Sequence, residues 1–143
     1  MVDQDILDAM KSTRNDPSTA TLDSITHILE FIKQISDEDD DIKRKLKNMN
    51  IAVQIIIIDK EAKFWVKVQD GKVDCGVGEI DEPSFKFSAK FEIAVMLLSY
   101  KITSYDAYME GHIIVEGNLQ DAMIFQELVE LGTKAYLNLV EED

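Results

Sequence analysis

The feature that most constrains the fold of this 143-residue chain is a change of hydrophobic period at Ile51. Before this point apolar residues recur at helical spacing, as between Leu22 and Ile32, whereas from Ile51 they alternate every second residue, which predicts strands. Asp70-Gly71 then indicates a two-residue hairpin, because both positions of such a turn need positive φ. Since 143 residues suit a single domain, we expect helices and a sheet that share one core.

The two hairpins predict how the first three strands pair. A four-residue loop over 59–62 places Ile57 opposite Phe64, and the glycine turn places Lys67 opposite Asp74. In this register apolar residues meet apolar residues on one face of the meander. We therefore expect a single core face.

The rest of the chain predicts two more strands and further helices. Ser36 with Asp39 resembles a capping box, Ser88 is placed to cap a helix after a strand over 84–88, and Asn118 is placed to cap the last helix after a strand over 112–116. The expected fold is α/β (α+β), with a largely antiparallel sheet of about five strands and helices packed on one face. Residues 1–21 are expected to form an N-terminal extension containing one helical turn, and residues 22–143 the single domain.

Charge and cysteine content narrow the functional classes. The formal net charge of −13 repels nucleic-acid phosphates and anionic membranes, and the longest apolar run is too short to cross a bilayer. We therefore expect no nucleic-acid partner and no stable membrane insertion. The single cysteine, Cys75, allows no intrachain disulfide, and the acidic first residues do not predict a signal peptide, so a cytoplasmic location is expected.

No pattern predicts catalysis or a metal. His27, His112 and Cys75 are too few and too far apart in sequence for a metal site, and the acidic stretch 36–41 lacks the glycine and spaced ligands of a calcium loop. No nucleophile has a neighbouring base. We expect no catalytic residue, no cofactor and no enzyme activity.

The second half of the chain resembles the sterol carrier protein type-two family. A helix opens with Phe91-Glu92, a short helix ends at Gly111, and a strand with Ile113 and Val115 lies between that glycine and Gly117. At the family's spacing follow Asn118-Leu119, Ala122-Met123 and Gln126, and upstream the chain has the Asp70-Gly71-Lys72 hairpin and Pro83 at a strand start. The resemblance covers about residues 22–131. It departs from the family pattern at Tyr100, and at His112, Ile114 and Glu116, where the family strand is more basic.

The resemblance implies a non-catalytic domain that binds, and in some members transfers, lipids such as fatty acids, acyl-CoA esters, sterols or isoprenoids in an apolar tunnel between sheet and helices. Methionines suit such a lining because the thioether adapts to irregular shapes, and a tyrosine or glutamine can orient a polar head. The expected ligand-binding residues are Phe64, Val66, Phe85, Phe87, Phe91, Val95, Met96, Tyr105, Tyr108, Met109, Ile113, Val115, Leu119, Met123 and Gln126.

Two alternatives stay open on the sequence. An apolar face is usually plain core, so the chain could be an interaction, dimerisation or enzyme-accessory module of the same fold without a stable ligand. The opposite face of the sheet carries Ile56, Ile58 and Trp65, and we call these three residues the outer patch. The outer patch either pairs two copies of the chain or contacts a partner, or else the N-terminal segment covers it.

Overall fold

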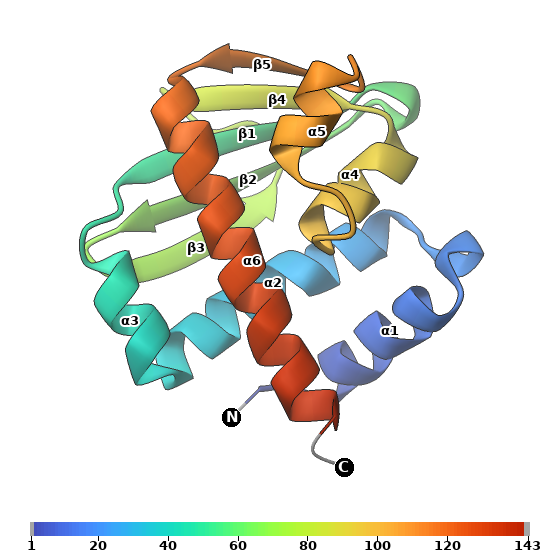
Figure 1. Cartoon of the computed structure of the whole chain (residues 1–143), viewed down its shortest axis with the longest axis vertical. Helices are drawn as coiled ribbons and strands as arrows, with labels where there is room; N and C mark the ends of the chain where they lie inside the picture. The colour runs from blue at the N-terminus through green and yellow to red at the C-terminus, as the bar shows by residue number, and fades with distance from the viewer. Residues whose placement is uncertain (1, 142–143) are drawn as a thin grey trace.

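The computed structural model describes residues 2–141 and contains a five-stranded sheet with the long helices on one side of it (Figure 1). The elements are α1 (Gln4–Asn15), η1 (Pro17–Thr19), α2 (Leu22–Glu38), α3 (Asp40–Leu46), β1 (Ile51–Ile57), η2 (Ile58–Lys60), β2 (Ala62–Gln69), β3 (Lys72–Val77), β4 (Phe85–Ala89), α4 (Phe91–Leu98), α5 (Ser104–Met109), β5 (Ile113–Gly117) and α6 (Leu119–Glu141), where η denotes a single 3-10 turn.

The strands lie in the order β3-β2-β1-β4-β5, and three of the four pairings are antiparallel. The pairing of β1 with β4 is parallel, so the sheet is mixed. In Figure 1, α6 runs across the front of the sheet, and α2 packs against β3. The prediction of about five largely antiparallel strands with helices on one face is confirmed.

The register of the second hairpin matches the prediction, with Lys67 opposite Asp74, but the first hairpin does not. Ile57 pairs with Ala62, and Phe64 pairs with Ile55, so the predicted register is wrong by two residues. The reason is that the loop starts one residue earlier, as the 3-10 turn η2. Because the pleat repeats every two residues, the shift leaves every side chain on its predicted face.

Two predicted helix caps are wrong. Ser36 lies inside α2, where its hydroxyl donates to the carbonyl of Ile32, and Asp39 caps α3 by itself, because its carboxylate accepts from the N–H groups of residues 41 and 42. Ser88 stays in strand β4, and α4 begins after Lys90. The predicted cap at Asn118 is confirmed, since its side chain accepts from the N–H groups of residues 120 and 121.

A connection from Gly78 to Ser84 crosses the outer face of the sheet and makes the parallel pairing of β4 with β1 possible. It is held by Gln54, whose side chain is buried on that face. The Gln54 amide nitrogen donates to the carbonyls of Phe64 and Gly78, at 2.8 and 2.9 Å, and its oxygen accepts from the Ile80 N–H at 2.8 Å. All three of these hydrogen bonds therefore join the Gln54 side chain to backbone groups.

The N-terminal segment forms a full helix, α1, rather than one turn, and α1 packs against α2 in the helical layer. The idea that this segment covers the outer patch is therefore wrong. The crossing connection covers part of that patch instead: Ile56 and Trp65 are half-buried, whereas Ile58 is 52% exposed. The Trp65 ring lies over Gly76, where a Cβ would be 2.6 Å from the ring nitrogen.

Candidate functional site

The expected ligand-binding residues fall into three groups by exposure. Six are buried, namely Phe64, Val66, Phe85, Phe87, Val95 and Ile113. Four are half-buried, namely Phe91, Met96, Val115 and Gln126. Five are exposed by half or more of their surface, namely Tyr105, Tyr108, Met109, Leu119 and Met123.

An apolar cavity lies between β4, β5, α4 and α6, next to the first residue of α5, and we call it the inner cavity. It brings together five expected residues: Phe85, Phe87, Ile113, Val115 and Gln126. Its volume is about 30 Å³. That is about the volume of one water molecule in the liquid, so side chains of the protein nearly fill the cavity.

On α6, sequence reasoning identified Gln126 but missed the three apolar residues beside it that line the inner cavity. Ala122, Phe125 and Val129 line it, and Phe125 fills much of the space beside the two phenylalanines of β4, with ring centroids 6.0 and 6.1 Å away. The signal was present, because residues 122, 125, 126 and 129 share one face at helical spacing. From α4 and the following loop the cavity adds Leu97, Leu98, Tyr100 and Ile102.

The short helix α5 borders the inner cavity at Ser104. Of its six side chains only Ala107 is fully buried. Its first residue is tied to α6, because the N–H of Ser104 donates to the side-chain oxygen of Gln126 at 2.6 Å and the Ser104 hydroxyl bonds to the same oxygen. The predicted headgroup residue Gln126 thus uses its oxygen to anchor α5.

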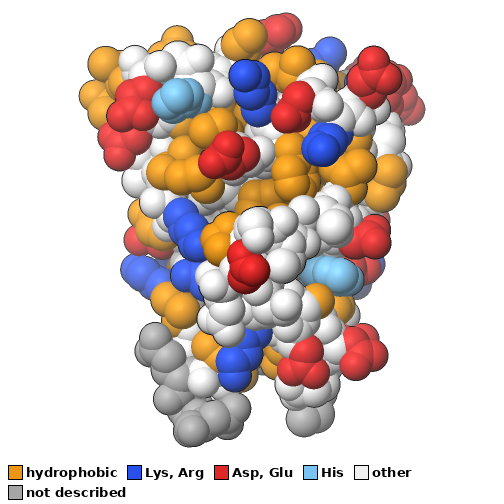
Figure 2. All heavy atoms as spheres, turned by 90° about the vertical axis from the view of Figure 1, so that its right-hand side faces the viewer, with side chains coloured by type: hydrophobic (Ala, Val, Ile, Leu, Met, Phe, Trp, Pro, Cys, Tyr) orange, Lys and Arg blue, Asp and Glu red, His pale blue; other side chains and the backbone are white. Residues whose placement is uncertain are grey.

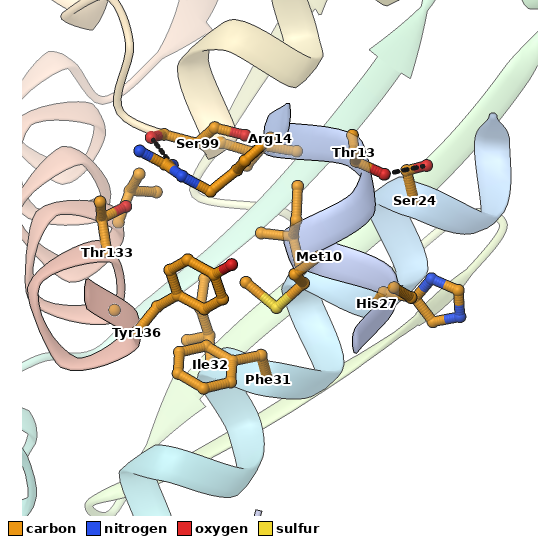
Figure 3. A pocket seen from close by; sticks show the side chains of 15 residues that line it. Met10, Thr13, Arg14, Ser24, His27, Phe31, Ile32, Ser99, Thr133 and Tyr136 are labelled. Carbon is orange, nitrogen blue, oxygen red and sulfur yellow. Dashed lines mark hydrogen bonds between the residues drawn. The ribbon is translucent and has the colours of Figure 1, made fainter. Parts of the chain in front are cut away.

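A second small space lies where α1 meets α2, α4 and α6 (Figure 3). Arg14 reaches across it and donates to the Ser99 carbonyl at the end of α4, 3.1 Å away. Its guanidinium carbon is 5.6 Å from the centre of the Tyr136 ring, and that ring packs edge-on against Phe31 at 5.9 Å. Burial raises the pKa of Tyr136, and the positive charge of Arg14 opposes this. These contacts fasten α1 to the helical layer.

A much larger space is an open cleft between α4 and the turn that joins α1 to α2, with a volume of about 690 Å³. We call it the open cleft. Phe91, Val95 and Met96, all expected ligand-binding residues, line it from α4, and Arg14 lines it from α1. Figure 2 looks onto the side of the molecule where α4 and η1 lie and shows hydrophobic side chains gathered in a hollow across its middle.

The titratable side chains of residues 2–141 include one free cysteine, Cys75, and several separate carboxylates. The described residues contain no group of three or more His, Cys, Asp or Glu side chains placed to hold a metal ion. Burial raises the pKa of the Cys75 thiol to about 11, with a smaller contribution from the nearby carboxylate of Glu30, so the reactive thiolate is scarce at neutral pH. Among residues 2–141, no helix combines the length and apolar character that crossing a membrane requires.

Comparison with protein families gives one match. The model of the SCP-2 sterol transfer family matches residues 32–130, which is more than half of the chain. No curated protein matches the chain in sequence.

Solved structures of similar fold include several sterol carrier proteins. The apo form of sterol carrier protein 2 from Yarrowia lipolytica is 14% identical, with a TM-score of 0.58 over 75% of this chain and 90% of that one. The palmitated sterol-carrier-like protein SCP2L2 from Aedes aegypti is 21% identical, with a TM-score of 0.55 over 71% and 90%. The sec-alkylsulfatase Pisa1 from Pseudomonas sp. is 13% identical, with a TM-score of 0.55 over 60% of this chain, which spans only 14% of that enzyme.

Proposed function

Because this chain belongs to the SCP-2 sterol transfer family, we propose that it binds a lipid in the inner cavity and carries it without altering it. The observation that supports this most directly is the lining of the inner cavity. Nearly all of its side chains are apolar, and its serine and glutamine are bonded to each other. The Gln126 oxygen and the Ser104 hydroxyl are therefore already hydrogen-bonded when a tail enters. Burial of each methylene would contribute about 0.8 kcal/mol.

The proposed binding requires a movement, because a cavity of about 30 Å³ cannot hold an alkyl chain. The helix α5 is the element best suited to move. It is six residues long and fully buries only Ala107, so its displacement exposes little apolar surface. We propose that α5 swings away from α6 and lets the tail enter over Phe125.

The exposed members of the expected site fit this movement. Tyr105, Tyr108 and Met109 lie on α5, and Leu119 and Met123 lie on the first turns of α6, where they contact mostly solvent in the closed form. When α5 moves, these side chains can cover the part of the tail that protrudes. Their amphipathic and flexible character suits this use. The candidate lipids are fatty acids, acyl-CoA esters, sterols and isoprenoids.

The proposal is tested by filling the inner cavity. Ala122 is half-buried and lines it, so Ala122→Phe would place a ring where the tail lies. The matched control is Asn138→Phe, which introduces the same residue at an exposed position on the far half of the same helix, away from the inner cavity. Palmitate is a suitable probe, because the Aedes aegypti relative was solved in a palmitated form.

We expect Ala122→Phe to weaken the affinity for palmitate, measured by displacement of a fluorescent fatty acid, by roughly tenfold or more. The reason is that the added ring takes up the space that the tail needs. Asn138→Phe should bind like the wild type, and circular dichroism should show both variants folded. Equal affinity in all three proteins would contradict binding in the inner cavity. A lipid-free mass for the purified wild type, together with no fatty-acid binding, would contradict the lipid-carrying function.

The outer patch favours a second candidate function, pairing of two copies of the chain. Of its three residues, Ile58 is 52% exposed and Trp65 is half-buried. An exposed apolar patch with tryptophan is typical of contact surfaces. We propose that Trp65→Asp lowers the sedimentation mass of the chain at high concentration. A wild-type chain that stays monomeric would remove this candidate.

A further inference from the structure

The open cleft is built partly by a segment outside the region that the family model matches. Five of its lining residues lie between Thr13 and Ala20, whereas the match begins at residue 32. The opposite wall comes from α4 and from Lys60 of η2. The cleft therefore depends on α1 and its turn being docked against the domain, and Arg14 provides that docking through Ser99 and Tyr136.

The charge of the open cleft is opposite to that of the chain. Arg14, Lys60 and Lys101 line it, against one carboxylate, Glu92. The whole chain has 15 cationic and 28 acidic residues, so a cationic site on it is unexpected from composition. Within residues 2–141, neither Lys60 nor Lys101 is in an ion pair with an acidic side chain.

The floor of the cleft is apolar and fixed. Phe91 and Val95 lie one turn apart on α4, and Met96 follows. The carboxylate of Asp59 accepts from the Phe91 N–H at 2.7 Å, which ties the η2 turn to the start of α4. As a result, the Lys60 ammonium is held 5.7 Å from the centre of the Phe91 ring, directly at the edge of the apolar floor.

We propose that the open cleft binds an anionic amphiphile, a molecule with one carboxylate or phosphate head and an apolar body, at a site separate from the inner cavity. The apolar body lies on Phe91, Val95 and Met96, and Lys60 and Lys101, which line the same cleft, attract the head. A volume of about 690 Å³ is in the range of small-molecule sites. The lysines attract an anion of either kind, because an ammonium recognises charge rather than a fixed planar geometry.

The methionines allow the site to be observed directly. With ¹³C-labelled methionine methyl groups, Met96 reports on the open cleft, while Met109 and Met123 report on α5 and the start of α6. The probes are dodecanoate and dodecyl phosphate, both below their micelle concentrations. Dodecanol supplies the same tail without charge, and inorganic phosphate supplies a head without a tail.

We expect the Met96 methyl resonance to shift with either anionic amphiphile, and inorganic phosphate alone to leave it in place. The double variant Lys60→Glu with Lys101→Glu should raise the dissociation constant measured at Met96 by roughly tenfold, which is what two partly exposed charge contacts supply. The charge-matched control is Lys45→Glu with Lys72→Glu, at two exposed positions on α3 and β3 that do not line the cleft, and it should bind like the wild type. Dodecanol binding should be the same in all three proteins.

Three results would overturn the proposal: a Met96 signal that does not move, a dissociation constant unchanged in the double variant, or an equal loss in the charge-matched control. The test is independent of the inner cavity. If Met109 and Met123 shift and Met96 does not, lipid binding near α5 stands and the open cleft is not a site. If Ala122→Phe abolishes the Met109 and Met123 shifts and keeps the Met96 shift, the two sites are separate as proposed.

Discussion

Gln126 on α6 accepts hydrogen bonds from both the backbone N–H and the hydroxyl of Ser104, the first residue of α5. One side-chain oxygen thus fixes the start of a helix whose only fully buried residue is Ala107. The contact lies at the lining of the inner cavity, so the stability of the closed form depends on it.

We expect Gln126→Leu to release α5. It removes the acceptor for two donors, and the loss of two ordinary hydrogen bonds should lower the free energy of unfolding by about 1–3 kcal/mol. Hydrogen exchange should speed up in α5 more than in the core strands. Gln126→Glu keeps an acceptor oxygen and is the matched control, and equal protection of α5 in wild type and Gln126→Leu would contradict the anchoring role.

The contact of Arg14 with Tyr136 and Ser99 predicts how α1 is held. Arg14→Ala removes a cation–π contact and a charged hydrogen bond, so urea denaturation should show a loss of about 1–2 kcal/mol, with α1 losing exchange protection first. Arg44→Ala provides the control, because that side chain is exposed and, within residues 2–141, forms an ion pair only with Asp41. It should change stability by less than about 0.5 kcal/mol. A similar small effect for Arg14→Ala would show that α1 is held by its apolar contacts alone.

Two glycines at positive φ should differ in their tolerance of alanine. A Cβ at Gly117 (φ 110°) would lie 2.8 Å from the Ser84 carbonyl oxygen, while a Cβ at Gly111 (φ 78°) meets nothing within 4 Å. We expect Gly111→Ala to cost about 1 kcal/mol from backbone conformation, and Gly117→Ala about 3 kcal/mol or more, because the steric clash adds to it. Thermal melts of both variants decide this, and equal melting temperatures would rule out the clash.

The Cys75 thiol should react slowly in the folded protein. Its pKa is raised from 9.0 to about 11, mainly by burial, so at pH 8 alkylation by iodoacetamide should be roughly 100-fold slower than in urea-unfolded chain. The raised pKa of Cys75 also makes the stability of the fold depend on pH. Below pH 9 the thiol is protonated in both states and has no effect. Between pH 9 and 11 the unfolded chain loses the proton first, so stability falls as pH rises. Equal alkylation rates in the folded and unfolded chain would contradict the raised pKa.

Much of the fold could be predicted, because turns, helix caps and the faces of strands are determined by residues close together in sequence. The glycine turn, the alternation of β1 and the cap at Asn118 follow from residues close in sequence. The first hairpin was predicted two residues out of register, since the pleat cannot distinguish loops that differ by such a shift. The parallel pairing of β4 with β1 was not predicted, because it depends on the distant contacts of Gln54.

The candidate site was predicted less well than the fold. The residues on β4 and β5 that line the inner cavity were identified from alternation, which specifies a face. Met123 and Tyr108 were expected in the site because their side chains are apolar or amphipathic and they lie close in sequence to residues that line the cavity. Both are more than half exposed. The open cleft was missed because its walls come from segments distant in the chain, such as Arg14 and Lys101, and charge counted over the whole sequence conceals a local cationic site.

The crossing connection held by Gln54 has a consequence for the order of assembly. The meander of β1, β2 and β3 closes through short turns, whereas β4 joins β1 only when Ser84 meets Ala52, 32 residues earlier. Closing that longer loop costs more chain entropy, which is offset when β4 pairs with β1 and the amide of Gln54 bonds to the backbone of the connection. Folding of this chain should therefore divide into a fast local phase and a later phase whose rate depends on one buried glutamine.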